Sequence, residues 1–106
     1  MRAGRRNRRI ALERPAMVQN ALGEELPGWQ MVARVWAFRK DRTATPERIA
    51  AGGITATPAV EYEIPFRRGI TADMRLEDAG EIWQIAHVSE IGHREGLRLL
   101  VERPGV

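Results

Sequence analysis

The segment between residues 60 and 67 constrains the fold more than any other part of the chain. Its residues alternate between apolar and polar side chains. The apolar face carries Val60, Tyr62, Ile64 and Phe66, and the polar face carries Glu61, Glu63, Pro65 and Arg67. A period of two is typical of a strand with one buried and one solvated face. The segment therefore predicts an antiparallel sheet with one side toward water.

Length and composition limit the chain to one small folded domain. With 106 residues it can form a single hydrophobic core, so we assign residues 1–106 to one domain. Hydrophobic residues make up 43% and charged residues 29%, which favours folding over disorder. The absence of cysteine excludes disulfides and thiolate metal sites. No apolar run reaches the roughly 18 residues of a spanning helix, so we expect a soluble protein without a membrane partner.

Positive charge is concentrated at the start of the chain. Residues 1–14 hold six arginines and one glutamate, whereas the rest of the chain has a net charge of −2. We call residues 1–9 the basic N-terminal arm. Such an arm can contact nucleic acid or an acidic protein partner, or it can be a solvated tail without function.

Further strand patterns recur along the chain with turn residues between them. We expect strands near residues 10–14, 29–39, 74–77, 81–89 and 97–102, an exposed loop over residues 20–28, and a hairpin turn at Asp78-Ala79-Gly80. Pro15 predicts the end or edge of the first strand. Together with residues 60–67, this pattern predicts a mainly β fold, a small antiparallel barrel or sandwich of five or six strands.

Residues 40–58 interrupt the strand pattern. Thr45, Pro46 and Glu47 are typical of a helix N-cap and first turn, and Gly52 is typical of a helix end. We therefore expect one short helix over residues 46–51 inside a long inserted loop. An insertion of this length in a small domain is usually either functional or disordered.

Each of the three tryptophans can lie either in the core or on a binding surface. Trp36 and Trp83 lie among aliphatic strand residues, so we expect both in the core. Trp29 follows the expected loop, and we expect it to be partly exposed, where it can take part in binding.

Residues that carry catalysis are not arranged for it. His87 and His93 have no third ligand at a metal-binding spacing, and Ser89 lacks a nucleophile elbow. The pairs Glu61/Glu63 and Glu77/Asp78 are expected to be solvated strand and turn residues. Gly52-Gly53 lacks the lysine and the serine or threonine of a phosphate loop. We expect no enzyme activity, no metal and no cofactor.

Taken in order, these segments resemble the head–tail joining family, the small head-closure proteins of tailed phages and gene transfer agents. The segments that carry the resemblance are Arg2-Ala3-Gly4-Arg5, residues 10–15, Trp29, Val35-Trp36-Ala37, Glu47-Arg48, residues 62–71, Met74-Arg75, Ile82-Trp83-Gln84-Ile85 and residues 97–102. The first turn, with Asn20 and Gly23, departs from the aspartate–glycine pattern of the family.

The resemblance implies a structural protein with a small β-barrel, made in the bacterial cytoplasm and located at the particle neck. It implies a ring of identical chains beneath the portal and adaptor proteins, which closes the exit channel for double-stranded DNA and binds a tail terminator or tail-completion protein. It implies docking to a partner ring through Arg2, Arg5, Arg6, Arg8, Arg9 and Trp29. It also implies that a loop carrying Arg42, Thr45, Glu47, Arg48, Gly52 and Gly53 faces the channel or a ring neighbour.

A small barrel of the OB or SH3-like kind that binds single-stranded nucleic acid is the alternative. Such a protein has exposed aromatic side chains among basic residues on one face of the sheet. Here the basic residues are mostly in the N-terminal arm and the body is acidic, which favours the head-closure interpretation.

Overall fold

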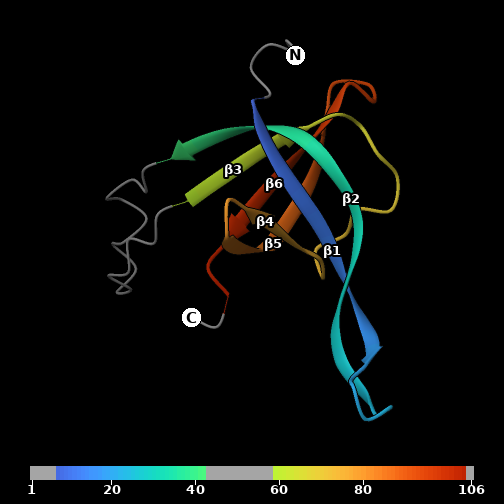
Figure 1. Ribbon diagram of the computed structural model, residues 1–106. Coiled ribbons are helices and arrows are strands. Elements are labelled where there is room, and N and C mark those ends of the chain that lie inside the picture. Colours follow the sequence, from blue (N-terminus) through green and yellow to red (C-terminus); the bar gives the residue numbers. More distant parts are fainter. Residues whose placement is uncertain (1–6, 43–58, 105–106) are drawn as a thin grey trace, which may run out of the picture.

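The computed structural model describes residues 7–42 and 59–104, which form six strands (Figure 1). They are β1 (Arg8–Gln19), β2 (Glu25–Arg42), β3 (Ala59–Ile64), β4 (Arg75–Asp78), β5 (Glu81–Ile91) and β6 (Gly96–Glu102). All paired strands are antiparallel, and the order β1-β2-β3-β6-β5-β4 closes on itself because β4 also pairs with β1. The predicted small antiparallel barrel is confirmed. The helix predicted over residues 46–51 lies outside the described residues.

The inner faces of the strands supply one core. Inward positions alternate with outward ones, as a pleated strand requires. The residues that are almost wholly buried include Ile10, Leu12, Ala37, Tyr62, Ile64, Met74, Leu76, Ile85 and Leu99. Val60, Tyr62 and Ile64 are buried as their alternation predicts, and Phe66 packs against the core at its edge.

The first two strands are longer than the sequence indicates. β1 continues past Pro15 to Gln19, and β2 begins at Glu25, so the loop expected over residues 20–28 is confined to residues 20–24. Pro15 is tolerated because this part of β1 has β2 as its only paired strand, which leaves its other edge without a ladder. Pro15 therefore marks an edge of β1, one of its two predicted places, and not the end of the strand.

Three side chains differ in exposure from what the sequence predicted. Trp36 is 50% exposed, because its neighbour Ala37 points into the core and successive residues of a strand face opposite sides. Glu61 and Asp78, expected to be solvated, are each 3% exposed. Trp83 is in the core, as predicted.

Candidate functional site

A two-stranded hairpin leaves the barrel and exposes apolar side chains to solvent (Figure 1). Residues 14–30 form it, and we call it the projecting hairpin. β1 pairs with β4 only as far as Glu13, and β2 pairs with β3 only from Phe38 onward, so within the hairpin each strand pairs only with the other. Its exposed large apolar residues are Met17, Val18, Leu22 and Leu26. Apolar groups gathered in this way mark interaction surfaces.

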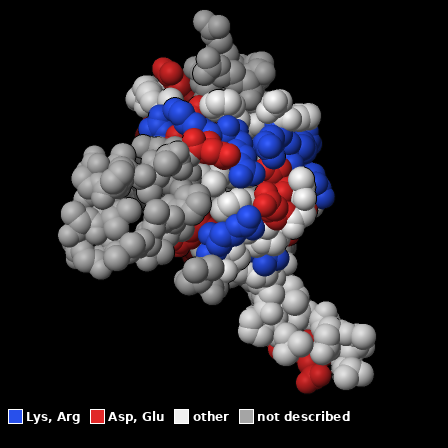
Figure 2. Space-filling view, turned by 90° about the vertical axis from the view of Figure 1, so that its left-hand side faces the viewer, with Lys and Arg blue, Asp and Glu red and all other residues white. Residues whose placement is uncertain are grey.

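The tip of the projecting hairpin is ordered and acidic. The side-chain oxygen of Asn20 accepts hydrogen bonds from the backbone N–H groups of Leu22, at 2.9 Å, and of Glu24, at 3.0 Å. Beyond Arg14, the only charged residues of the hairpin are Glu24 and Glu25. Figure 2 shows the contrast: basic and acidic side chains mingle over the barrel, whereas the hairpin is mostly uncharged with acidic groups near its tip.

A cluster at the base of the hairpin fixes its direction. The register of β1 against β2 shifts between Leu12 and Glu13, and such bulges bend a strand and increase its twist. Arg75 Nε on β4 lies 2.6 Å from Glu13 Oε1, and the guanidinium of Arg75 lies 4.3 Å from the centroid of the Trp29 ring. Arg75 thus ties both strands of the hairpin to the barrel.

A second exposed surface lies on the barrel wall around Trp36. The guanidinium of Arg9 lies 5.2 Å from the centroid of the Trp36 ring. Arg34 is exposed on the same face of β2, two residues from Trp36. In the part of the chain that the structure describes, neither Arg9 nor Arg34 forms an ion pair with a carboxylate. We call Arg9, Arg34 and Trp36 the Trp36 patch.

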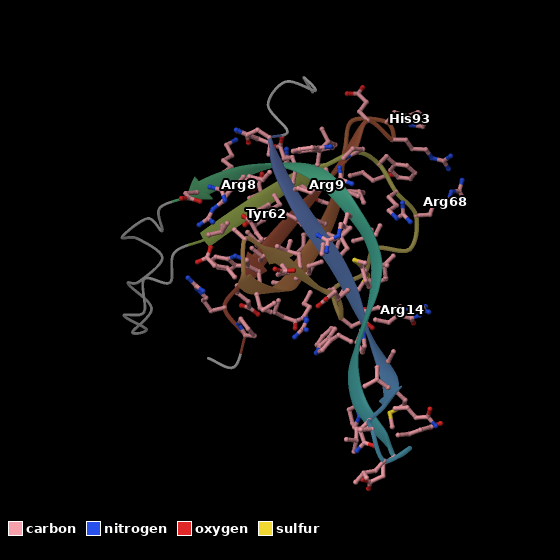
Figure 3. The ribbon with its side chains drawn as sticks, viewed as in Figure 1. Arg8, Arg9, Arg14, Tyr62, Arg68 and His93 are labelled. Carbon is pink, nitrogen blue, oxygen red and sulfur yellow. The ribbon has the colours of Figure 1, made fainter. Side chains whose placement is uncertain are left out.

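Asp78 is the centre of a buried polar cluster that joins five strands. Its Oδ2 accepts a hydrogen bond of 2.6 Å from the Tyr62 hydroxyl and one of 2.9 Å from Arg8. Arg39 lies 3.9 Å from the same oxygen and 3.4 Å from Glu81 on β5. In Figure 3 Arg8 and Tyr62 lie close together on one side of the barrel, whereas Arg68 and His93 lie on the other. The cluster ties β1, β2 and β3 to β4 and β5.

The electrostatics of this cluster favour structure over proton transfer. Burial, and then the hydrogen bond to Asp78, raise the pKa of Tyr62 above its ordinary value. The hydrogen bond to Asp41 raises the pKa of Arg39 above its already high ordinary value. Both groups therefore keep their protons at physiological pH, and neither is suited to general acid–base catalysis.

The predicted docking residues fall into three groups. Arg8 and Arg9 begin β1, where Arg8 binds Asp78 and Arg9 stacks on Trp36. Trp29 is half-buried at the base of the hairpin, away from the other two. Arg2, Arg5 and Arg6 lie outside the described residues, as do Thr45, Glu47, Arg48, Gly52 and Gly53 of the predicted loop; Arg42 ends β2. Partner-ring docking by these residues stays a prediction.

Sequence reasoning missed Asp78 and Arg75 as organising residues. Asp78 is two residues from Leu76 on β4, so strand alternation alone places it on the inward face. Arg75 gave no comparable signal, because its contacts come from Glu13 and Trp29, both distant in sequence.

Metal ligands are not grouped among the described residues. Among residues 7–42 and 59–104, no three histidine, cysteine or acidic side chains are grouped so that they could hold a metal ion. The same residues include no helix of the length and hydropathy needed to cross a bilayer. What the surface does present is an apolar hairpin and an aromatic, basic patch.

A comparison with known protein families identifies the chain's relatives. The sequence model of the phage head completion proteins matches residues 1–104. The chain belongs to this family. The resemblance drawn from the sequence is thereby confirmed over almost the whole chain.

Solved structures share the fold at low sequence identity. The solution structure of a Shigella flexneri 2a protein is 21% identical with a TM-score of 0.69, and the match covers 99% of this chain and 98% of that one. A chain from the virion of a native gene transfer agent is 20% identical with a TM-score of 0.62, covering 92% and 93%. The protein xkdH of the phage-like element PBSX of Bacillus subtilis is 7% identical with a TM-score of 0.51, covering 92% and 93%. No curated protein matches the chain.

Proposed function

We propose that this chain is a structural protein of the neck of a phage or a gene transfer agent, where it completes the filled head and joins it to the tail. The observation that carries the proposal is the match of residues 1–104 to the phage head completion proteins. The likeness in fold to a chain of a gene transfer agent virion agrees with it. The role requires no catalysis, and the described surface is suited to protein contacts.

We further propose that the chains form a ring between the portal or adaptor proteins and the tail-completion protein, and that this ring closes the DNA exit channel. The strands pair with one another around the closed barrel, and the edges left free include β1 after Glu13 and β2 before Phe38, so contacts between chains should use the projecting hairpin or surface groups. The projecting hairpin and the Trp36 patch are two such groups. The basic N-terminal arm and the loop over residues 40–58 keep the docking and channel roles predicted for them.

Deletion and labelling in the producing strain test the proposed function. Without the gene, DNA-filled heads should lose their DNA and stay tailless, and the wild-type chain supplied in trans should restore both properties. Immunogold electron microscopy should place the chain at the junction of head and tail. Particles of normal titre from the deletion strain, or label distributed over the head shell or tail tube, would contradict a role in head completion.

Binding of single-stranded nucleic acid is the second candidate, and one observation favours it. Trp36 is half-exposed between Arg9 and Arg34, which is the combination that a base-stacking surface uses. The patch has only one half-exposed large aromatic, however, whereas stacking platforms usually hold successive bases. Anisotropy of a labelled oligothymidylate, read at low and high salt, distinguishes the two functions. Binding that weakens with salt and with Trp36→Ala would support the nucleic-acid role.

A further inference from the structure

Within the part of the chain that the structure describes, the apolar side chains of the projecting hairpin are left uncovered beyond its base. An isolated two-stranded hairpin is marginally stable in water, and this one exposes apolar residues on both faces. Leu22 at the tip is 84% exposed. Among the described residues, the contacts that tie the hairpin to the barrel lie at its base, through Arg75. The rest of the hairpin surface is therefore available to another molecule.

The Trp36 patch complements the hairpin in both polarity and charge. Among the described residues outside the hairpin, the exposed large hydrophobic side chains are Met31, which borders the hairpin on β2, and Trp36 on the barrel wall. Arg9 and Arg34 beside it have no carboxylate partner among those residues, and Glu25 at the hairpin tip has no cation. An apolar, acidic tip thus has its counterpart in an aromatic, basic wall.

The two surfaces cannot meet within one chain. Both lie on β1 and β2, which run without interruption from the barrel into the hairpin. The hairpin points away from the barrel (Figure 1), and the bulge at Leu12/Glu13 and the contacts of Arg75 fix that direction. The patch of one copy is therefore free to receive the hairpin of another.

We propose that the projecting hairpin of each chain docks on the Trp36 patch of a second copy, with Leu22 and Leu26 against Trp36 and with Glu24 and Glu25 near Arg9 and Arg34. A contact between two different surfaces of identical chains is heterologous, and such contacts close into a ring when the rotation between neighbours permits. The inference rests on the proposed function, because it supplies the contact between neighbours in the proposed ring.

Site-directed cross-linking tests this contact without background, because the chain contains no cysteine. The hairpin probe is Ala21→Cys, beside Leu22, and the patch probe is Asn7→Cys, two residues from Arg9; both positions are exposed. Ala72→Cys, exposed in the loop before β4, is the matched control. Purified full-length chains are mixed in pairs at high concentration and oxidised, and the same pairs are tested in assembled particles.

The hairpin and patch probes should cross-link at least about tenfold more than the hairpin and control probes, a ratio that corresponds to about 1.4 kcal/mol. Glu24→Lys with Glu25→Lys should abolish that excess, and so should Arg9→Glu with Arg34→Glu. Mixing the two charge-reversed chains should restore it. Melting curves of all variants should match wild type, which shows that loss of cross-linking is not loss of folding.

Three outcomes would overturn the inference. The first is that the hairpin probe cross-links equally to the patch and control probes, or that it cross-links in neither the purified chain nor the particles. The second is failure of the mixed charge-reversed chains to recover. The third is an oligothymidylate that binds the patch while the hairpin probe gives no excess cross-linking there. If cross-linking fails while deletion still leaves tailless heads, the proposed function stands and the hairpin docks elsewhere. If cross-linking succeeds and deletion has no effect, the contact stands and the proposed function fails.

Discussion

The barrel and the projecting hairpin are built from the same two strands, yet the same kind of residue is buried in one and exposed in the other. In the barrel, Ile10 and Leu12 on β1 have β4 beside them and the core beneath, and neither is exposed. A few residues further on, Met17 and Val18 have only β2 as a neighbour and are exposed. An apolar strand residue thus indicates burial only where a second layer or a second neighbour covers it.

The buried residues of the barrel and the exposed residues of the hairpin should therefore serve different purposes, the first the stability of the fold and the second assembly. Barrel residues contribute burial of apolar area, which is the dominant favourable term in folding. Hairpin residues contribute little to the stability of the isolated chain, because their apolar side chains stay exposed. Burial of that apolar area would contribute to the free energy of association with a partner. Substitutions in the barrel should therefore lower the free energy of unfolding, and substitutions in the hairpin should weaken association.

The largest contrast should be between the two tryptophans of the barrel wall. Trp83→Ala should lower the free energy of unfolding by about 3–5 kcal/mol, because the ring is buried in the core. Trp36→Ala should cost about 1 kcal/mol or less, because it removes only a half-exposed ring and its contact with Arg9. Urea unfolding followed by circular dichroism measures both. Similar losses of stability for the two variants would contradict the placement of Trp83 in the core and of Trp36 on the outer surface.

The next effect should come from the buried carboxylate. Asp78→Ala removes the acceptor of both Tyr62 and Arg8, and loss of one partner of a buried polar cluster costs about 3 kcal/mol. Glu24→Ala, which removes an exposed carboxylate at the hairpin tip, is the matched control and should be nearly neutral. Thermal melting of the pair is sufficient. An Asp78 variant as stable as the control would show that the cluster does not hold the barrel together.

The sequence predicted the barrel because its signals there are local. Alternation over residues 60–67 placed Val60, Tyr62 and Ile64 inward, and Asp78-Ala79-Gly80 predicted a hairpin that the structure contains. In that turn Ala79 has φ 52° and Gly80 has φ 89°, the conformation that such tight hairpins require. Short-range rules were sufficient for these elements.

The docking surfaces could not be predicted in the same way. β2 carries apolar residues on both faces, so a period of two could not tell whether Trp36 or Ala37 points inward. Pro15 and Gly28 resemble strand ends, which concealed the length of the hairpin. The partners of Asp78 and Arg75 come from distant parts of the chain, and closure of the barrel, in which β4 pairs with β1, brings them together.

A smaller effect should follow from Tyr62, and it should depend on pH. Tyr62→Phe removes one hydrogen bond to a carboxylate and should cost about 1.5–3 kcal/mol at neutral pH. The pKa of Tyr62 is raised in the folded state, so its contribution is complete below the unfolded tyrosine pKa of about 10 and is lost as the pH rises above it. Stability of the wild type should therefore fall above about pH 10 more steeply than that of Tyr62→Phe.

Ultraviolet difference titration checks this directly, because Tyr62 is the chain's only tyrosine. Its ionisation should appear well above the ordinary pH and coincide with unfolding. Parallel stability curves for wild type and Tyr62→Phe up to high pH would exclude the hydroxyl as the group responsible.

The smallest effect on folding should be in the hairpin, and it is the one that tests the comparison most directly. Val18→Ala with Leu26→Ala removes two apolar side chains that face each other across the ribbon, and should change the free energy of unfolding by about 0.5 kcal/mol or less per site. Leu12→Ala, on the same strand but inside the barrel, should cost about 2–5 kcal/mol. Denaturant unfolding compares the two. The effect on particle assembly should be different. The hairpin variant should fold but fail to assemble, because the apolar area that it loses belongs to the interface. A hairpin variant that is strongly destabilised, or one that assembles at wild-type titre, would contradict the division of β1 into a folding part before Glu13 and a docking part after it.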